Sequence, residues 1–151
     1  NKLKNNKLFS PQVTSFVSIV AQSKNIRNLL KKYQKNFAKN RLACIEGRDI
    51  GSVICPNADI KIFFKCSLNV KAKRRMHEFK KLNKKITFKE VKKALRKRDL
   101  TDTKRKNSPL RLPLSAYIVD TSKLSKKQVV SKLSKIIEQK LISKYGRNYK
   151  T

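Results

Sequence analysis

Residues 46–59 have the sequence EGRDIGSVICPNAD, in which an arginine and an aspartate stand between two glycines. An apolar run, LACI at 42–45, precedes this stretch and predicts a buried strand over 42–46. Ligands of open α/β sheets bind beyond the carboxyl ends of the strands. An arginine fork and a carboxylate acceptor at such an edge therefore indicate a candidate binding loop. A structural alternative is that Arg48 and Asp49 only cap the turn that follows.

Strand and helix patterns alternate on both sides of this loop. Further apolar runs predict strands at 60–66 and 116–120. Apolar residues at helical spacing, with Ser and Thr capping signals, predict helices at 11–22, 24–38, 70–81, 87–103 and 126–142. This alternation predicts an α/β fold with a mostly parallel sheet, and its short apolar strands imply a sheet covered on both faces. Three strands are few for such a sheet, and a chain that begins with Asn1 rather than Met suggests that part of the domain lies upstream.

Two further groups of arginines follow along the chain. Arg98, Asp102 and Arg105 fall on one narrow helix face, because successive residues of a helix are about 100° apart. Either an anion-binding face or a solvated ladder of ion pairs explains this spacing. Arg74 and Arg75 lie in the basic run KAKRRM at 71–76. One of the two can reach a ligand while the other faces solvent, or both belong to a solvated face.

The chain carries 40 Lys and Arg against 9 Asp and Glu, a formal net charge of +31. Such a charge first suggests a small basic nucleic-acid-binding protein. Only ten of the 40 are arginines, and a lysine excess also arises on ordinary solvated faces of proteins from AT-rich genomes. Cys44, Cys55 and Cys66 form no CxxC pair, which argues against zinc and disulfides and favours a reducing cytoplasm. No apolar run is long enough to span a membrane.

Together these segments resemble the bacterial cytidylate kinase family. The resemblance rests on GRDxGSVxxPNA at 47–58, KIF at 61–63, AKRRM at 72–76, RDxxDxxR at 98–105, PL at 109–110 and VDT at 119–121. It begins near Val13 and covers nearly the whole chain. It implies a P-loop NTPase-type nucleoside monophosphate kinase, a cytoplasmic monomer that transfers the γ-phosphoryl group of ATP to CMP or dCMP with Mg²⁺. It also implies CMP-binding helices at about 11–40, a core at 41–68 and 112–151, and a lid at about 70–105.

The resemblance carries roles for individual residues of this sequence. The implied contacts with CMP are Ser18, Arg27 and Asp49 to the cytosine, Arg48 and Arg105 to the phosphate, and Arg98 and Asp102 near the sugar. Arg74 and Arg75 would belong to the lid and act with Arg105 on the transferring phosphoryl group, because such transfer depends mainly on positioning and charge stabilisation. Six of the ten arginines occupy these kinase positions, and a nucleic-acid-binding protein has no reason to place them there.

The chain departs from the family in two respects. It has three glycines and no GxxxxGK[ST] phosphate loop, so it resembles the C-terminal two-thirds of such an enzyme. With the loop go the first strand and the hydroxyl expected to bind Mg²⁺, and we expect this chain alone to be inactive. In addition, Glu46 stands where the family more often has Asp, which leaves open the role of this acid beside metal-bound water.

Overall fold

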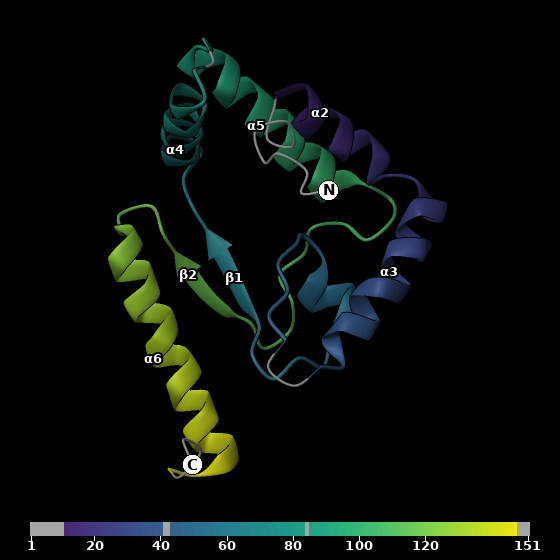
Figure 1. The fold of residues 1–151 in the computed structure, drawn as a ribbon, viewed down its shortest axis with the longest axis vertical. Helices are drawn as coiled ribbons and strands as arrows, with labels where there is room; N and C mark the ends of the chain where they lie inside the picture. Colours follow the sequence, from purple (N-terminus) through teal and green to yellow (C-terminus); the bar gives the residue numbers. More distant parts are fainter. Residues whose placement is uncertain (1–10, 41–42, 84, 148–151) are drawn as a thin grey trace.

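The computed structural model describes residues 11–40, 43–83 and 85–147. Its elements in chain order are α2 (Pro11–Val20), α3 (Lys24–Ala38), a short π-helix η1 (Ile50–Ile54), β1 (Ile62–Lys65), α4 (Leu68–Lys81), α5 (Phe88–Lys104), β2 (Tyr117–Asp120) and α6 (Lys126–Tyr145). Figure 1 shows β1 and β2 side by side, with α6 beside β2. The α4–α5 pair lies beyond the carboxyl ends of the two strands. The five predicted helices are confirmed, and α6 extends three residues beyond its predicted end at 142.

The sheet consists of two parallel strands. β1 pairs with β2 in a register that sets Ile62 opposite Tyr117 and Lys65 opposite Asp120. Hydrogen bonds from Tyr117 N to Lys61 O and from Thr121 N to Lys65 O, both 2.8 Å long, extend the pairing at either end. The predicted strands at 60–66 and 116–120 and their parallel arrangement are therefore confirmed. The mixture of helices and a small parallel sheet agrees with the predicted α/β class.

The predicted strand at 42–46 is wrong for the residues described. Residues 43–46 adopt no regular structure and both Ala43 and Cys44 are exposed; Leu42 lies outside the described residues. A strand needs a neighbour to pair its backbone groups, and in the described part of the chain β1 pairs with β2 alone. The expectation of a sheet covered on both faces is also wrong for the described residues, because side chains on both faces of β1 and β2 are exposed. Phe64 and Ile118 point to opposite faces and are 52% and 46% exposed.

The α4–α5 hairpin contains the main apolar cluster. Ala72, Phe79 and Val91 are buried, and the side chains packed against them are Met76, Ile86, Phe88 and Leu95. Within α4 and α5 these positions recur every three or four residues, which places them on the facing sides of the two helices, and Ile86 precedes α5. This seam joins α4 to α5, and the ion pairs Arg48–Asp102 and Asp49–Arg105 join α5 to the loop after α3.

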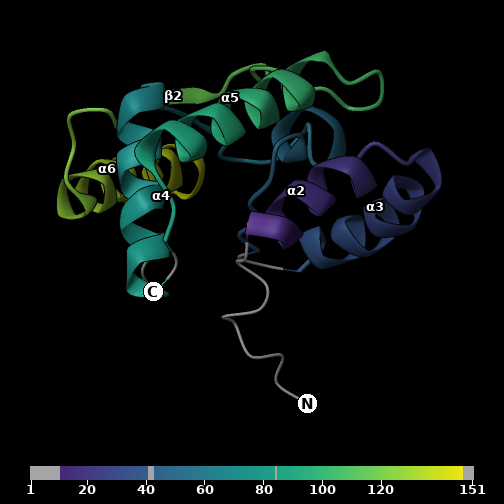
Figure 2. The same cartoon turned by 90° about the horizontal axis from the view of Figure 1, so that it is seen from above.

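The apolar stripe of α3 is exposed. Leu29 and Tyr33 are 60% and 67% exposed, although their helical spacing is typical of a buried face. The polar side of the same helix, which carries Arg27, faces the loop that contains Asp49. The ion pair Arg27–Asp49 links α3 to this loop. Figure 2 shows α2 and α3 lying together at one side of the molecule.

The capping box of α5 makes the stability of this helix depend on pH. The Thr87 backbone N–H donates to Glu90 Oε2 at 2.8 Å, and the Thr87 hydroxyl donates to the same oxygen at 2.6 Å. These bonds hold the pKa of Glu90 below its ordinary value of 4.5, so the bonds stabilise the fold above that pH and are lost as the pH falls through the lowered value. We expect Glu90→Gln to lower the melting temperature at pH 7 and to differ less from the parent at low pH. Thermal unfolding followed by circular dichroism from pH 7 to pH 3 measures this, and a difference that is constant with pH would contradict it.

Candidate functional site

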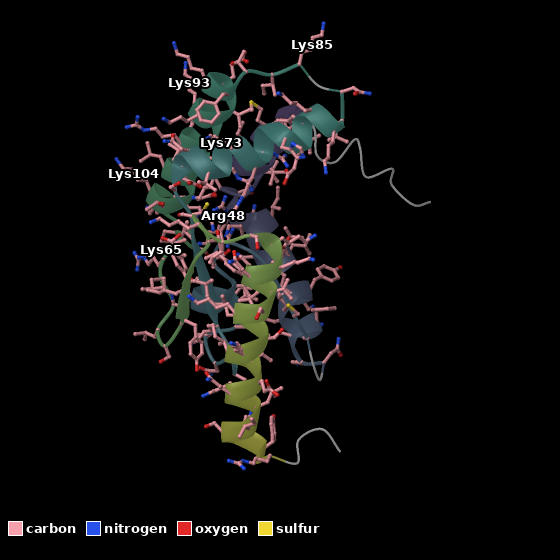
Figure 3. All side chains as sticks on the ribbon, turned by 90° about the vertical axis from the view of Figure 1, so that its left-hand side faces the viewer. Arg48, Lys65, Lys73, Lys85, Lys93 and Lys104 are labelled. Atoms are coloured by element: carbon pink, nitrogen blue, oxygen red, sulfur yellow. The ribbon has the colours of Figure 1, made fainter. Side chains whose placement is uncertain are left out.

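The candidate site brings together the loop before η1 and the C-terminal half of α5. Arg48 and Asp49 lie in the bend that leads into η1, and Asp49 is the N-cap residue of this π-helix. Arg98 and Asp102 lie on α5, and Arg105 is the C-cap residue of the same helix. In Figure 3, Arg48 lies near the middle of the molecule, with labelled lysines of α4, α5 and β1 on the same side. Ion pairs with Asp102 bring Arg48 together with Arg98 and Arg105.

Asp102 is the centre of this cluster and is only 4% exposed. Its Oδ2 atom lies 3.1 Å from Arg48 Nε and 3.9 Å from Arg98 Nε, and its Oδ1 atom lies 3.6 Å from Arg105 Nη1. Arg98 Nε and Asp102 Oδ2 are buried and make no hydrogen bond. With the neighbouring ion pairs included, the cations Arg27, Arg48, Lys71, Arg98 and Arg105 outnumber the carboxylates Asp49, Asp99 and Asp102. This excess of positive charge favours the approach of an anion.

Asp49 forms the second carboxylate of the cluster and is 7% exposed. Its Oδ1 atom lies 3.4 Å from Arg105 Nη2, and its Oδ2 atom accepts a hydrogen bond from Arg27 Nη2. Arg105 therefore contacts both Asp49 and Asp102, and its Nε donates to Ser108 O at 2.6 Å. The alternative that Arg48 and Asp49 only cap a local turn is wrong, because both side chains pair with residues far away in the sequence.

Burial and like charges act on the arginines of the cluster. Desolvation lowers the pKa of Arg98, and the neighbouring Arg48 lowers it further, while Asp102 opposes both effects. Desolvation also lowers the pKa of Arg105, followed by the effect of Arg27, against the attraction of Asp49 and Asp102. An arginine still stays charged at neutral pH. These partly desolvated cations would therefore interact more strongly with an anion than arginines in bulk water.

The comparisons with known proteins agree on one family. The cytidylate kinase family profile matches residues 1–139. This chain belongs to the cytidylate kinase family. The relatives named cytidylate kinase include those of Clostridium tetani (37% identity over 137 residues, 91% of this chain and 61% of the relative), Fusobacterium nucleatum (38% over 133 residues, 88% and 61%) and Thermosipho melanesiensis (36% over 135 residues, 89% and 62%). The chain thus spans about three-fifths of the length of these relatives. The comparisons give no support to the alternative of a basic nucleic-acid-binding protein.

The two arginines that the resemblance to cytidylate kinases places in a lid lie outside the Asp102 cluster. Arg74 donates to Thr121 O at 2.7 Å and to Leu124 O at 3.1 Å, which ties α4 to the segment after β2. Arg75 pairs with Glu78 at 2.7 Å and lies over the ring of Phe79, 4.6 Å from its centroid. Arg75 also contributes to the lowered pKa of Arg98, so its charge acts on the cluster from α4.

Two predicted residues have no contact that the structure describes within the cluster. Glu46 is exposed. Ser18 lies in α2, and its side chain is outside the described residues. Among the described residues, no group of three or more His, Cys, Asp and Glu side chains could hold a metal ion. No described helix is long and apolar enough to cross a membrane.

Sequence reasoning missed the roles of Asp99 and Lys71. Lys71 Nζ on α4 donates to Asp99 Oδ2 at 2.8 Å, and Asp99 Oδ1 lies 3.6 Å from Arg48 Nη1. Asp99 thus links the α4–α5 hairpin to the Arg48 loop. The sequence did indicate a position for Asp99 near Asp102, because the two residues are three apart and share a helix face. Lys71 carried no signal of its own, since only the packing of α4 on α5 brings it there.

Proposed function

We propose that this chain supplies the CMP-binding part of a P-loop NTPase-type nucleoside monophosphate kinase, which transfers the γ-phosphoryl group of ATP to CMP or dCMP. The observation that carries the proposal is the arginine cluster around two buried carboxylates, built from the motif residues of the cytidylate kinase family. Guanidinium groups bind phosphate oxygens with two parallel hydrogen bonds. A group of them in one place suits a monophosphate.

Within this site, Arg48 and Arg105 would bind the phosphate of CMP. The Arg48 side chain is 34% exposed, so a ligand can reach it, whereas the Arg105 side chain is only 4% exposed. Both arginines already pair with carboxylates, so an incoming phosphate would compete with Asp49 and Asp102 for them. The carboxylates would then be available to accept hydrogen bonds from the nucleoside, from the cytosine amine at Asp49 and from a sugar hydroxyl at Asp102. We assign Arg98 to the sugar beside Asp102, and Arg27 and Ser18 to the cytosine.

The α4–α5 hairpin would act as the lid over the transferring phosphoryl group. Of its two adjacent arginines, Arg74 is bound to two backbone carbonyls, which suits an anchor. Arg75 is bound to an exposed partner, Glu78, and its charge already acts on Arg98. We therefore assign Arg75 to the phosphoryl group and Arg74 to the attachment of the lid. Stabilising developing charge is the main task of such residues.

ATP would be the phosphoryl donor. The described residues do not fit a Mg²⁺ site, because they contain no group of carboxylate, His and Cys side chains that could hold a metal. No role for Glu46 in metal binding follows from its exposed position.

Cys44, Cys55 and Cys66 are all free thiols, which supports a reducing compartment such as the cytoplasm. The enzyme of this proposal acts there as a monomer.

Two substitutions test the division of roles within the site. The assay protein is a chimera that joins residues 1–151 to the portion of the Clostridium tetani relative that this chain does not match. We expect Asp49→Ala to lower kcat/KM for CMP more than for UMP, which lacks the exocyclic amine, because a hydrogen-bonding site rejects a ligand that leaves its groups unpaired. Arg48→Ala should lower kcat/KM for both monophosphates alike, by about 10²-fold or more.

The measurement is ADP release in a coupled assay, with CMP and UMP varied in turn at saturating ATP. Melting temperatures of both variants control for loss of the fold, since Asp49 also pairs with Arg27 and Arg105. Equal changes of the CMP-to-UMP ratio in the two variants would contradict these roles. Absence of any CMP-dependent turnover in the unsubstituted chimera would contradict the proposed function itself.

A further inference from the structure

A cavity of about 190 Å³ lies between α3 and the loop after α5, outside the Asp102 cluster. The residues that line it are Lys24, Arg27, Asn28, Lys31, Ile54, Lys106, Asn107 and Ser108. The four residues from α3 are spaced at i, i+3, i+4 and i+7, so they form one stripe of the helix. This is the polar stripe that faces the protein, opposite the exposed apolar stripe of α3.

The lining is strongly biased toward donors and positive charge. Seven of the eight lining residues carry side-chain N–H or O–H groups, four of these are Lys or Arg, and none is acidic. In the described part of the chain, Lys24, Lys31 and Lys106 take part in no ion pair that the structure contains. Arg27 is the exception, because it pairs with Asp49. Like charges brought together without a counter-charge repel one another, and an anion between them removes that repulsion.

The wall opposite α3 is held in place by the site cluster. Arg105 Nε donates to Ser108 O at 2.6 Å, and Leu110 N donates to Asp102 O at 2.8 Å. Ser108 has a φ of 51°, an uncommon conformation for a residue other than glycine, which these bonds stabilise. The cavity therefore has one wall on α3 and one on a loop whose backbone is hydrogen-bonded to Arg105 and Asp102 of the site.

We propose that this cavity binds a small tetrahedral oxyanion of the phosphate class. Its lining offers many donors and cations and lacks carboxylates, which suits a ligand with several acceptor oxygens. Pockets for drug-sized ligands have volumes of roughly 300–1,000 Å³, so a cavity of about 190 Å³ suits a phosphate with a few waters better than a whole nucleotide. The cavity adjoins the CMP site of the proposed function, because Arg27 lines the cavity and pairs with Asp49 of that site. The inference does not require the proposed activity.

The test is a titration with inorganic phosphate, followed by amide chemical shifts in ¹⁵N-labelled chimera at constant ionic strength. We expect saturable shifts centred on residues 24–31 and 106–108. Lys31→Gln and Lys106→Gln should each weaken phosphate binding about tenfold, because each removes a charge-assisted hydrogen bond. The matched control is Lys35→Gln, on the same helix but outside the cavity lining, which should bind phosphate as the parent does. Melting temperatures verify that each variant is folded.

Three results would overturn the proposal. Shifts that chloride reproduces at equal ionic strength would show only screening of the lysines. Equal weakening by Lys35→Gln would show that the phosphate binds to the general positive field rather than to the cavity. Displacement of phosphate by CMP, with loss of the same shifts, would show that the anion occupies the phosphate position of the nucleotide site. Simultaneous binding of CMP and phosphate would instead support two sites. If phosphate binds but CMP does not, the result counts against the proposed function and not against the phosphate site.

Discussion

Purified chain of residues 1–151 is expected to give no measurable CMP-dependent release of ADP from ATP, whereas the chimera with the unmatched portion of the Clostridium tetani relative turns over. The 151-residue sequence has three glycines and no GxxxxGK[ST] motif. In P-loop enzymes the backbone of that loop, its lysine and its Ser or Thr hydroxyl neutralise the β- and γ-phosphates of the donor. Removal of a single preorganised donor costs about 10²–10³ in rate, so absence of the whole set should abolish turnover.

The measurement is a coupled assay for ADP with CMP and Mg·ATP, run in parallel on both proteins at equal concentration. The resemblance to the family implies a glycine-rich phosphate loop in the portion taken from the relative. The control is the chimera with the lysine of that implied loop changed to Met, which should lose activity while it keeps its melting temperature. Turnover by residues 1–151 within tenfold of the chimera would contradict the expectation. Such a result would mean that this chain binds the donor phosphates by groups other than a glycine-rich loop.

Asp102→Ala is expected to destabilise the fold by about 3 kcal/mol, because it removes a buried carboxylate that pairs with Arg48, Arg98 and Arg105. Arg48 keeps Asp99 and Arg105 keeps Asp49, whereas Arg98 loses its one ion pair within the described residues. The Asp102 side chain is only 6% exposed, so water cannot replace it fully. Asp102→Asn keeps the shape of the side chain but removes the charge. We expect it to be nearly as destabilising as Asp102→Ala, since the loss arises from the charge rather than from packing.

Urea unfolding of the chimera, followed by circular dichroism, measures these free energies. Asp59→Asn is the matched control, because Asp59 pairs with Lys144 at the surface and an exposed ion pair contributes only about 0–1 kcal/mol. A loss for Asp102→Asn no larger than for Asp59→Asn would contradict the view that Asp102 holds the arginines together.

Local sequence was enough to locate most of the secondary structure. The capping box at Thr87 and Glu90 begins α5 where it was predicted, and the box at Ser125 and Gln128 begins α6. Such caps act between residues three apart, so no distant part of the chain is needed to form them. The prediction of a strand at 42–46 was wrong, because a strand, unlike a helix cap, forms only when another strand pairs with it.

The candidate site divides in the same way. The sequence by itself determined the helix face shared by Arg98, Asp102 and Arg105, because helical periodicity sets which residues lie together on one turn after another. Only the tertiary structure decided that Arg48 and Arg27 reach the two carboxylates, that Lys71 binds Asp99, and that Arg74 is held by backbone carbonyls after β2. These contacts join residues about 22 to 54 positions apart, so they depend on how whole elements pack. The physical reason is that hydrogen bonds within a helix cap or turn need only neighbouring residues, whereas a cluster of like charges persists only where packing and distant carboxylates hold it.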